Sequence, residues 1–267
     1  MFRSTLALAL LAATAFSANA AVLYDQNVTN NVIMGTGITN GGFTVDRANN
    51  IELGLRARER YDLINNQPSN VTGSNGDGTY NQNAGEPPNF PTSNRARWNF
   101  DWSVNSDLSG TSGQKLNALT YLIGMDFDPG VGTNFLAFDP LNLPCADHSF
   151  GNNLTSQSGG AEVSPDCKPV NAPANAIAYA DLLAGNNLAQ NSWNYDFFDS
   201  LAFPFNPTVD GTYTVFLQAS SANGLLARSQ IDVIVGRGAQ VPEPASLALL
   251  GIGLAGLAVA RRRKQMA

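Results

Sequence analysis

Gly211-Thr212-Tyr213-Thr214-Val215-Phe216-Leu217 consists mainly of β-branched and aromatic residues, which favour a β-strand. A loop through Ala222-Asn223-Gly224 leads to an alternating run, Ser229-Gln230-Ile231-Asp232-Val233-Ile234-Val235. Two such runs joined by a loop containing glycine predict an antiparallel β-hairpin.

The same alternation of apolar and polar side chains occurs at Ile51–Tyr61 and at Leu119–Phe127. The charged residues of the first segment also suit a helix. However, Arg56, Arg58 and Arg60 lie on one face only if the segment is a strand. We therefore expect strands in both segments.

Few features of the sequence indicate helices. Only Ala174–Ala184, an Ala-rich run that could pack against a sheet edge, suggests one in the central part of the chain. The chain has 30 Asn, 25 Gly and 14 Pro, and the segments Ser69–Asn94 and Ala146–Pro173 are loop-like. Short strands without intervening helices predict an antiparallel β-sandwich, Ig-like or jelly-roll-like, over residues 21–236.

The N-terminus has the composition of a secretory signal peptide. Arg3 supplies a positive charge, Leu6–Ala13 is apolar, and Ala18-Asn19-Ala20 offers the small residues that signal peptidase requires. A buried N-terminal helix is the alternative interpretation. We expect residues 1–20 to be removed and the exported protein to begin near Ala21.

The charge of the exported part limits its partners. Between Ala21 and Val241 there are 20 acidic and 10 basic residues, which gives a net charge of −10. Because a nucleic-acid partner requires a basic face, this composition argues against one. A solvated acidic surface explains the charge best, and calcium or a cationic partner is the weaker alternative.

The chain has two cysteines, Cys145 and Cys167. In an exported protein such a pair most simply forms a disulfide. Metal ligation or a free thiol remains the alternative.

The C-terminus has three parts in a fixed order. A polar spacer, residues 237–241, leads to Pro242-Glu243-Pro244, and Ala245–Ala260 is a run of sixteen residues without a charge. Arg261-Arg262-Arg263-Lys264 follows. As a helix the apolar run would cover roughly 24 Å, slightly less than a hydrocarbon core, and the basic cluster would stay on the cytoplasmic side. We expect one transmembrane helix here.

This order resembles the PEP-CTERM sorting signal of Gram-negative bacteria that make extracellular polysaccharide. The resemblance implies that exosortase, a membrane enzyme, recognises residues 242–264. The rest of the chain is also similar to exported PEP-CTERM proteins of unassigned function, through Ile51–Ala57, Ser74–Tyr80 and Gly211–Thr214. That similarity implies a sorting route through the inner membrane to the cell surface or matrix, and it implies no activity.

Candidate catalytic groups are sparse. His148 is the single histidine, so a cluster of histidines around a metal is excluded, and a Cys145–His148 nucleophile conflicts with the expected disulfide. Asp126 and Asp128, two residues apart, could serve glycoside hydrolysis or bind calcium. Asp77 in a Gly-rich turn is a weaker calcium candidate. Solvated acids at the end of a strand are the simpler interpretation of Asp126 and Asp128, and a tight Gly-rich turn explains Asp77 as well as calcium does, so we expect no cofactor.

Two functions remain open. The first is a non-enzymatic surface or matrix protein associated with exopolysaccharide, in which exposed Trp98, Trp102 or Trp193 could stack on sugars. For each tryptophan, however, packing in the core is the simpler expectation. The second is an exported hydrolase of that polysaccharide that uses Asp126 and Asp128. The absence of short catalytic motifs favours the first.

Overall fold

The predicted hairpin is present in the computed structural model, where β13 (Gly211–Ser221) pairs antiparallel with β14 (Gly224–Val235). The structure describes residues 21–29, 38–60, 63–64, 67–68, 71–141, 148–156, 161–163 and 172–239. Odd-numbered side chains of β13 point into the core and even-numbered ones point outward, because successive side chains of a strand alternate between its faces.

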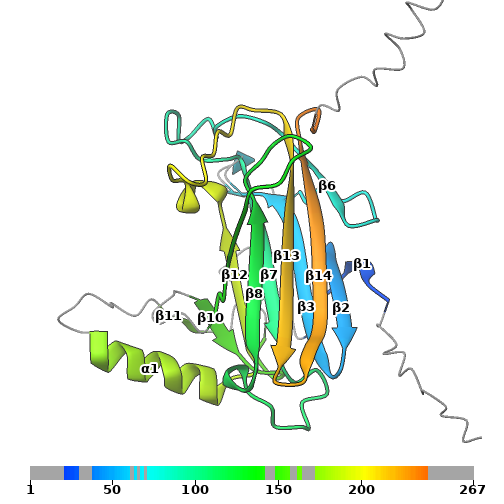
Figure 1. The fold of residues 1–267 in the computed structure, drawn as a ribbon, viewed down its shortest axis with the longest axis vertical. Helices are drawn as coiled ribbons and strands as arrows, with labels where there is room; N and C mark the ends of the chain where they lie inside the picture. Colours follow the sequence, from blue (N-terminus) through cyan, green and yellow to red (C-terminus); the bar gives the residue numbers. More distant parts are fainter. Residues whose placement is uncertain are drawn as a thin grey trace, which may run out of the picture.

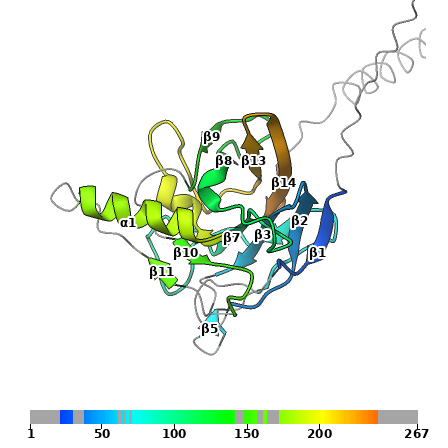
Figure 2. The ribbon, with the colours of Figure 1, turned by 90° about the horizontal axis from the view of Figure 1, so that it is seen from below.

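Two sheets pack face to face as a sandwich (Figures 1 and 2). In sheet order, the seven-stranded sheet consists of β1 (Leu23–Gln26), β2 (Phe43–Ala48), β3 (Ile51–Glu59), β7 (Trp98–Asn105), β12 (Leu188–Trp193), β10 (His148–Gly151) and β11 (Ala161–Val163). The five-stranded sheet consists of β6 (Thr79–Gln82), β14, β13, β8 (Thr120–Asp126) and β9 (Phe135–Phe138). Two further strands of two residues each, β4 (Leu63–Ile64) and β5 (Gln67–Pro68), pair with each other in a separate small sheet.

The main core lies between the two sheets. Large apolar side chains from both sheets are buried there, among them Leu53, Leu55, Trp98, Phe100, Trp102, Ile123, Met125, Val215, Leu217, Ile231 and Val233. Removing this much apolar surface from water is the main force that holds the sheets together. The mainly β fold that the sequence predicts is thus confirmed.

The outer face of the seven-stranded sheet is also buried, and it is polar. Arg56 and Arg58 of β3 both donate Nε–H to Oδ2 of Asp101 on β7, at 2.8 and 2.6 Å, and all three side chains are inaccessible to solvent. The guanidinium of Arg56 also lies 4.3 Å from the ring centroid of Phe43 and donates to the carbonyl of Gly41. The segment before β2 therefore covers part of this face and shields its ion pairs from water.

The pairing of β6 departs from the antiparallel expectation. β6 runs parallel to β14, from Thr79↔Asp232 to Gln82↔Val235. The chain enters β6 after leaving the other sheet at β3 and returns to that sheet at β7, so no hairpin fixes the direction of β6. Strands β6, β10 and β11 also lie within segments that the sequence predicts to be loops.

The predicted helix Ala174–Ala184 is confirmed as α1 (Ala172–Gly185), and two short 3₁₀ helices are present, η1 (Leu116–Ala118) and η2 (Tyr195–Phe198). Tyr179 and Leu183 of α1 are buried, and the Tyr179 hydroxyl donates to the carbonyl of Leu141. No helix in the ranges described above is long and apolar enough to cross a membrane. The segment expected to span the membrane, 245–260, lies outside those ranges.

Candidate functional site

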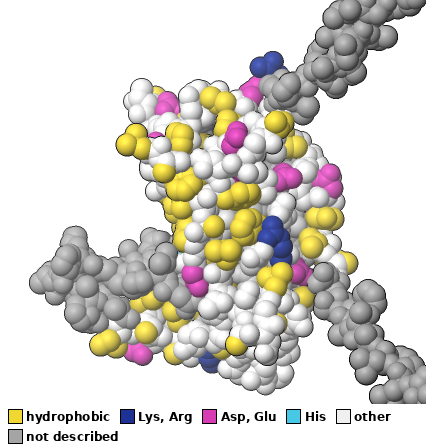
Figure 3. Space-filling model, viewed as in Figure 1, with side chains coloured by type: hydrophobic (Ala, Val, Ile, Leu, Met, Phe, Trp, Pro, Cys, Tyr) yellow, Lys and Arg dark blue, Asp and Glu magenta, His cyan; other side chains and the backbone are white. Residues whose placement is uncertain are grey.

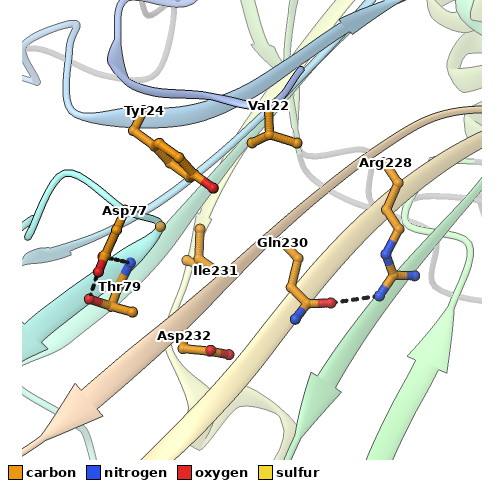
Figure 4. Close-up of a pocket in the computed structure, with 9 residues that line it drawn as sticks. Val22, Tyr24, Asp77, Thr79, Arg228, Gln230, Ile231 and Asp232 are labelled. Atoms are coloured by element: carbon orange, nitrogen blue, oxygen red, sulfur yellow. Dashed lines mark hydrogen bonds between the residues drawn. The ribbon is translucent and has the colours of Figure 1, made fainter. Parts of the chain in front are cut away.

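A groove of about 330 Å³ lies on the outer side of the sandwich, between β1 and the five-stranded sheet (Figure 4). Three elements line it: β1, the turn that leads into β6, and β14. Its lining residues are Val22, Tyr24, Asp77, Gly78, Thr79, Arg228, Gln230, Ile231 and Asp232. The groove therefore combines one aromatic ring with hydroxyl, carboxylate, amide and guanidinium groups.

Tyr24 forms one wall of this groove. β1 is the edge strand of the seven-stranded sheet, so it pairs with a strand on one side only. Tyr24 is 40% exposed there. Its ring lies against the turn at Gly78, where a Cβ would come within 3.1 Å of Tyr24 Cε1. Gly78 also has φ +90°, a conformation that L-residues rarely adopt. Glycine is thus required here for two reasons, and it allows the ring to lie close to the turn.

The opposite wall is a row of polar side chains on β14. Arg228, Gln230 and Asp232 are at alternate positions, so all three point outward while Ser229, Ile231 and Val233 are buried. The Arg228 guanidinium donates to Oε1 of Gln230 at 2.7 Å. This hydrogen bond holds the planar groups of Arg228 and Gln230 in place before any ligand binds.

Aromatic rings extend the polar row across the five-stranded sheet. Phe216 on β13 faces Gln230 in the pairing register, and the Arg228 guanidinium lies 4.4 Å from the Phe216 ring centroid. Phe135 on β9 follows, with its ring centroid 5.5 Å from that of Phe216. The Phe216 ring lies over Gly124 of β8, and a Cβ at Gly124 would collide with it. We call Tyr24, Gln230, Arg228, Phe216 and Phe135 the sheet strip. Figure 3 shows hydrophobic side chains next to a Lys/Arg group on this face.

The groove lining includes two carboxylates, Asp77 and Asp232, and one guanidinium, Arg228. Hydrogen bonds from the hydroxyl and amide of Thr79 lower the pKa of the Asp77 carboxyl, so this group is ionised at neutral pH. Partial burial lowers the pKa of Arg228, but a guanidinium remains protonated in proteins. The groove therefore presents charged groups of both signs beside an exposed aromatic ring.

This arrangement suits a ligand that has apolar ring faces and many hydroxyl groups. Aromatic side chains stack on flat apolar faces, and planar amide, carboxylate and guanidinium groups form paired hydrogen bonds with neighbouring hydroxyls. Sugar rings have both features. A strip that crosses several strands, spaced about 4.8 Å apart, offers such contacts to an extended chain of rings.

The carboxylates considered for hydrolysis or calcium binding organise turns. Asp126 is buried at the end of β8, and its Oδ1 accepts the backbone amides of Asp128 and Asn134, at 3.0 and 2.6 Å. Asp128 accepts the amide of Gly130. Asp77 lies in another turn, next to β6, which β14 and β13 separate from β8. In the part of the chain that the structure describes, no three His, Cys, Asp or Glu side chains lie close enough to hold a metal ion.

His148 is buried in an aromatic cluster. Its ring centroid lies 4.9 Å from that of Trp102, and its two ring nitrogens contact the carbonyl of Pro140 and the amide group of Asn191. These contacts give His148 a structural role in β10. Trp98 and Trp102 are fully buried and Trp193 packs against the same core, so core packing, the simpler expectation for the three tryptophans, is confirmed.

Several predicted residues lie outside the described ranges. They are the cleavage residues Ala18 and Ala20, the cysteines Cys145 and Cys167, the motif Pro242-Glu243-Pro244 and the basic cluster Arg261-Arg262-Arg263-Lys264. The expectations for them therefore remain predictions from the sequence.

Sequence reasoning missed the sheet strip. Phe216 and Gln230 were placed correctly on opposite strands of a hairpin, but no pattern showed that their outward face would carry aromatic rings next to an arginine. The spacing of Arg228, Gln230 and Asp232 on the polar side of a strand was the available signal. Tyr24 could not be linked to that row, because the sequence does not reveal that β1 packs beside the turn at Gly78.

Comparison with known proteins identifies the C-terminal segment alone. Residues 240–264 match the family model of the PEP-CTERM protein-sorting motif. No curated protein and no solved structure matches the chain. The motif implies processing by exosortase and an exported protein that is associated with the membrane or the cell surface.

Proposed function

We propose that this exported chain, which carries the PEP-CTERM sorting motif, is a non-enzymatic matrix protein that holds exopolysaccharide on the sheet strip. Signal peptidase removes residues 1–20, the apolar run 245–260 spans the inner membrane as a helix, and exosortase then processes the tail. The body reaches the cell surface or extracellular matrix with the strip exposed.

The single observation that carries this proposal is the row formed by Tyr24, Gln230, Arg228 and Phe216. Two exposed or partly exposed rings, one on β1 and one on β13, flank the fixed planar polar groups of β14. The partners of Asp126 support a binding role over hydrolysis, because its Oδ1 is already occupied by two backbone amides. A general acid or nucleophile must instead be able to contact its substrate.

The test measures both retention and chain length of the host's own polysaccharide after incubation with the exported protein. We expect retention without shortening. Tyr24→Ala and Arg228→Gln should each weaken retention by about tenfold, the effect of losing roughly 1.4 kcal/mol of contact free energy. Phe197→Ala is the matched control, because Phe197 is also an exposed ring but belongs to η2, outside the strip.

Two results would contradict the proposal. One is polysaccharide retention that is equal in the Tyr24→Ala variant, the Phe197→Ala variant and the natural protein. The other is shortening of the polysaccharide that disappears when Asp126→Asn and Asp128→Asn are introduced together, which would establish the hydrolase instead.

A further inference from the structure

Three loops and the last described residues meet at one end of the sandwich, the upper end in Figure 1. The loops are residues 83–97, 127–134 and 194–210, and residues 236–239 follow β14. Hydrogen bonds and an ion pair connect them: Gly85 N to Pro207 O, Asn94 Nδ2 to Asp199 Oδ2, Asn134 Nδ2 to Ala202 O, Thr212 N to Pro129 O, and Arg237 Nε to Asp210 Oδ2. We call this surface the loop end.

The loop end exposes large apolar side chains from each of its three loops. Leu201 is fully exposed, and Val131 and Phe197 are 65% and 51% exposed. Phe90 and Val209 are also exposed. Between two of the loops lies an apolar hollow of about 250 Å³, lined by Phe127, Pro129, Pro204, Phe205, Asn206, Val209 and Tyr213. Single exposed apolar residues are common in proteins, but such a group at one end indicates an apolar partner.

The tips of these loops carry no charge, although 13% of the chain is charged. Residues 87–94, 129–134 and 200–209 contain no Asp, Glu, Lys or Arg. The acidic residues that flank the tips are engaged within the body: Glu86 accepts two backbone amides, and Asp199 accepts the amide of Phe205. The apolar side chains are therefore the groups best placed to contact a partner.

The C-terminal tail leaves from this same end. Ala239 is held there because its amide donates to the Thr212 hydroxyl, and the apolar run begins at Ala245. At about 3.3–3.6 Å per residue, the chain between these two residues spans at most roughly 20 Å. β14, which has twelve residues, is about 40 Å long. While the apolar run is in the membrane, the body cannot turn its opposite end toward the bilayer.

We propose that the loop end is a lipid-contacting surface, and that the tips of its loops insert into the outer leaflet of the membrane in which the tail is anchored. This inference rests on the membrane route proposed above and is independent of polysaccharide binding. Apolar side chains at the ends of loops enter the headgroup region readily, and aromatic rings favour that interface. Because the tips carry no charge, the contact depends little on salt concentration.

The test uses the full chain, purified and reconstituted into vesicles of phosphatidylethanolamine and phosphatidylglycerol. A photoreactive phenylalanine analogue replaces Leu201 in one variant and Leu225 in the other. Leu225 is the matched control, because it is also an exposed leucine but lies in the first residues of β14, at the opposite end of the hairpin from the loop end. We expect cross-links to lipid at least fivefold more frequent from position 201 than from position 225, with little change between low and high salt.

Each other outcome overturns the inference. Equal lipid cross-linking at the two positions would mean that the loop end does not face the bilayer. A cross-linked product of twice the chain's mass from position 201 would identify a second copy as the partner. If the chain does not float with the vesicles, the membrane anchor of the proposed function is contradicted as well. The first two outcomes, in contrast, contradict only the inference about the loop end.

Discussion

Arg58 donates its Nε–H to Oδ2 of Asp101 across 2.6 Å, and both side chains are completely buried on the outer face of the seven-stranded sheet. Arg56 donates to the same oxygen, so one carboxylate serves two guanidinium groups. Removing the carboxylate would leave two buried cations without their shared partner, which costs far more than losing a surface ion pair.

We therefore expect Asp101→Asn to lower the free energy of unfolding by about 3–5 kcal/mol, measured by urea denaturation. Asp210→Asn is the matched control, because its partner Arg237 is largely exposed and the surrounding water screens that pair. Similar losses in the two variants would contradict the shielding assigned to the segment before β2.

The same ion pair predicts how stability depends on pH. Burial raises the pKa of the Asp101 carboxyl, but the charges and hydrogen bonds of Arg58 and Arg56 outweigh that effect and lower the pKa overall. Since an unfolded Asp has a pKa of about 3.9, the folded chain binds fewer protons at this site. The stabilisation is thus complete above about pH 4 and is lost as the pH falls through the folded-state pKa.

The measurement is the difference in the free energy of unfolding between the natural protein and Asp101→Asn, at pH 6 and at pH 3. This difference should shrink at pH 3, because the Asp101 carboxyl of the unfolded chain binds a proton there while the folded one, with its lowered pKa, still resists protonation. A difference that stays constant would refute the lowered pKa.

Gly124→Ala should disturb the sheet strip directly. The added methyl group would meet the Phe216 ring, so the ring must leave its position over β8, and overpacking of this kind costs about 1–3 kcal/mol of stability. Polysaccharide retention should fall together with stability. Gly185→Ala is the control, since a Cβ there meets no atom within 4 Å. Unchanged polysaccharide retention in a folded Gly124→Ala variant would show that Phe216 does not contribute to the proposed binding strip.

Cys145 and Cys167 should form an intramolecular disulfide in the exported protein. Mass spectrometry of unreduced peptides is the measurement. Reduction should lower the free energy of unfolding by roughly 3 kcal/mol, because the bond restricts the unfolded chain. Two thiols that react with an alkylating reagent in freshly exported protein would show that this prediction is wrong.

The strands were largely predictable from the sequence, and their surroundings were not. Alternation placed Ile51, Leu53 and Leu55 on one face and Arg56 and Arg58 on the other, as the structure confirms. Alternation reports which side chains share a face, but not what covers it, so the burial of both arginines was unforeseen. β6 was missed because Thr79–Gln82 is short and lies among Asn and Gly residues typical of loops.

The candidate site was less predictable, because it depends on contacts between distant segments. Tyr24 and Gly78 are far apart in sequence and meet only because β1 lies at a sheet edge beside the turn before β6. The tryptophans were the visible aromatic candidates for binding sugars, but their size and apolar character placed them in the core. The sorting motif was identified from the sequence because its three parts are consecutive.

β14 has a mechanical consequence for an anchored protein. It carries Arg228, Gln230 and Asp232 of the groove, and Ala239 follows four residues after its end. A pull between a bound polysaccharide and the tail would act along this strand, which is bonded to β13 on one side and to β6 on the other. Such a pull shears many backbone hydrogen bonds at once instead of opening them one by one. In the proposed arrangement, the strand between the ligand and the membrane is therefore held on both sides against such a pull.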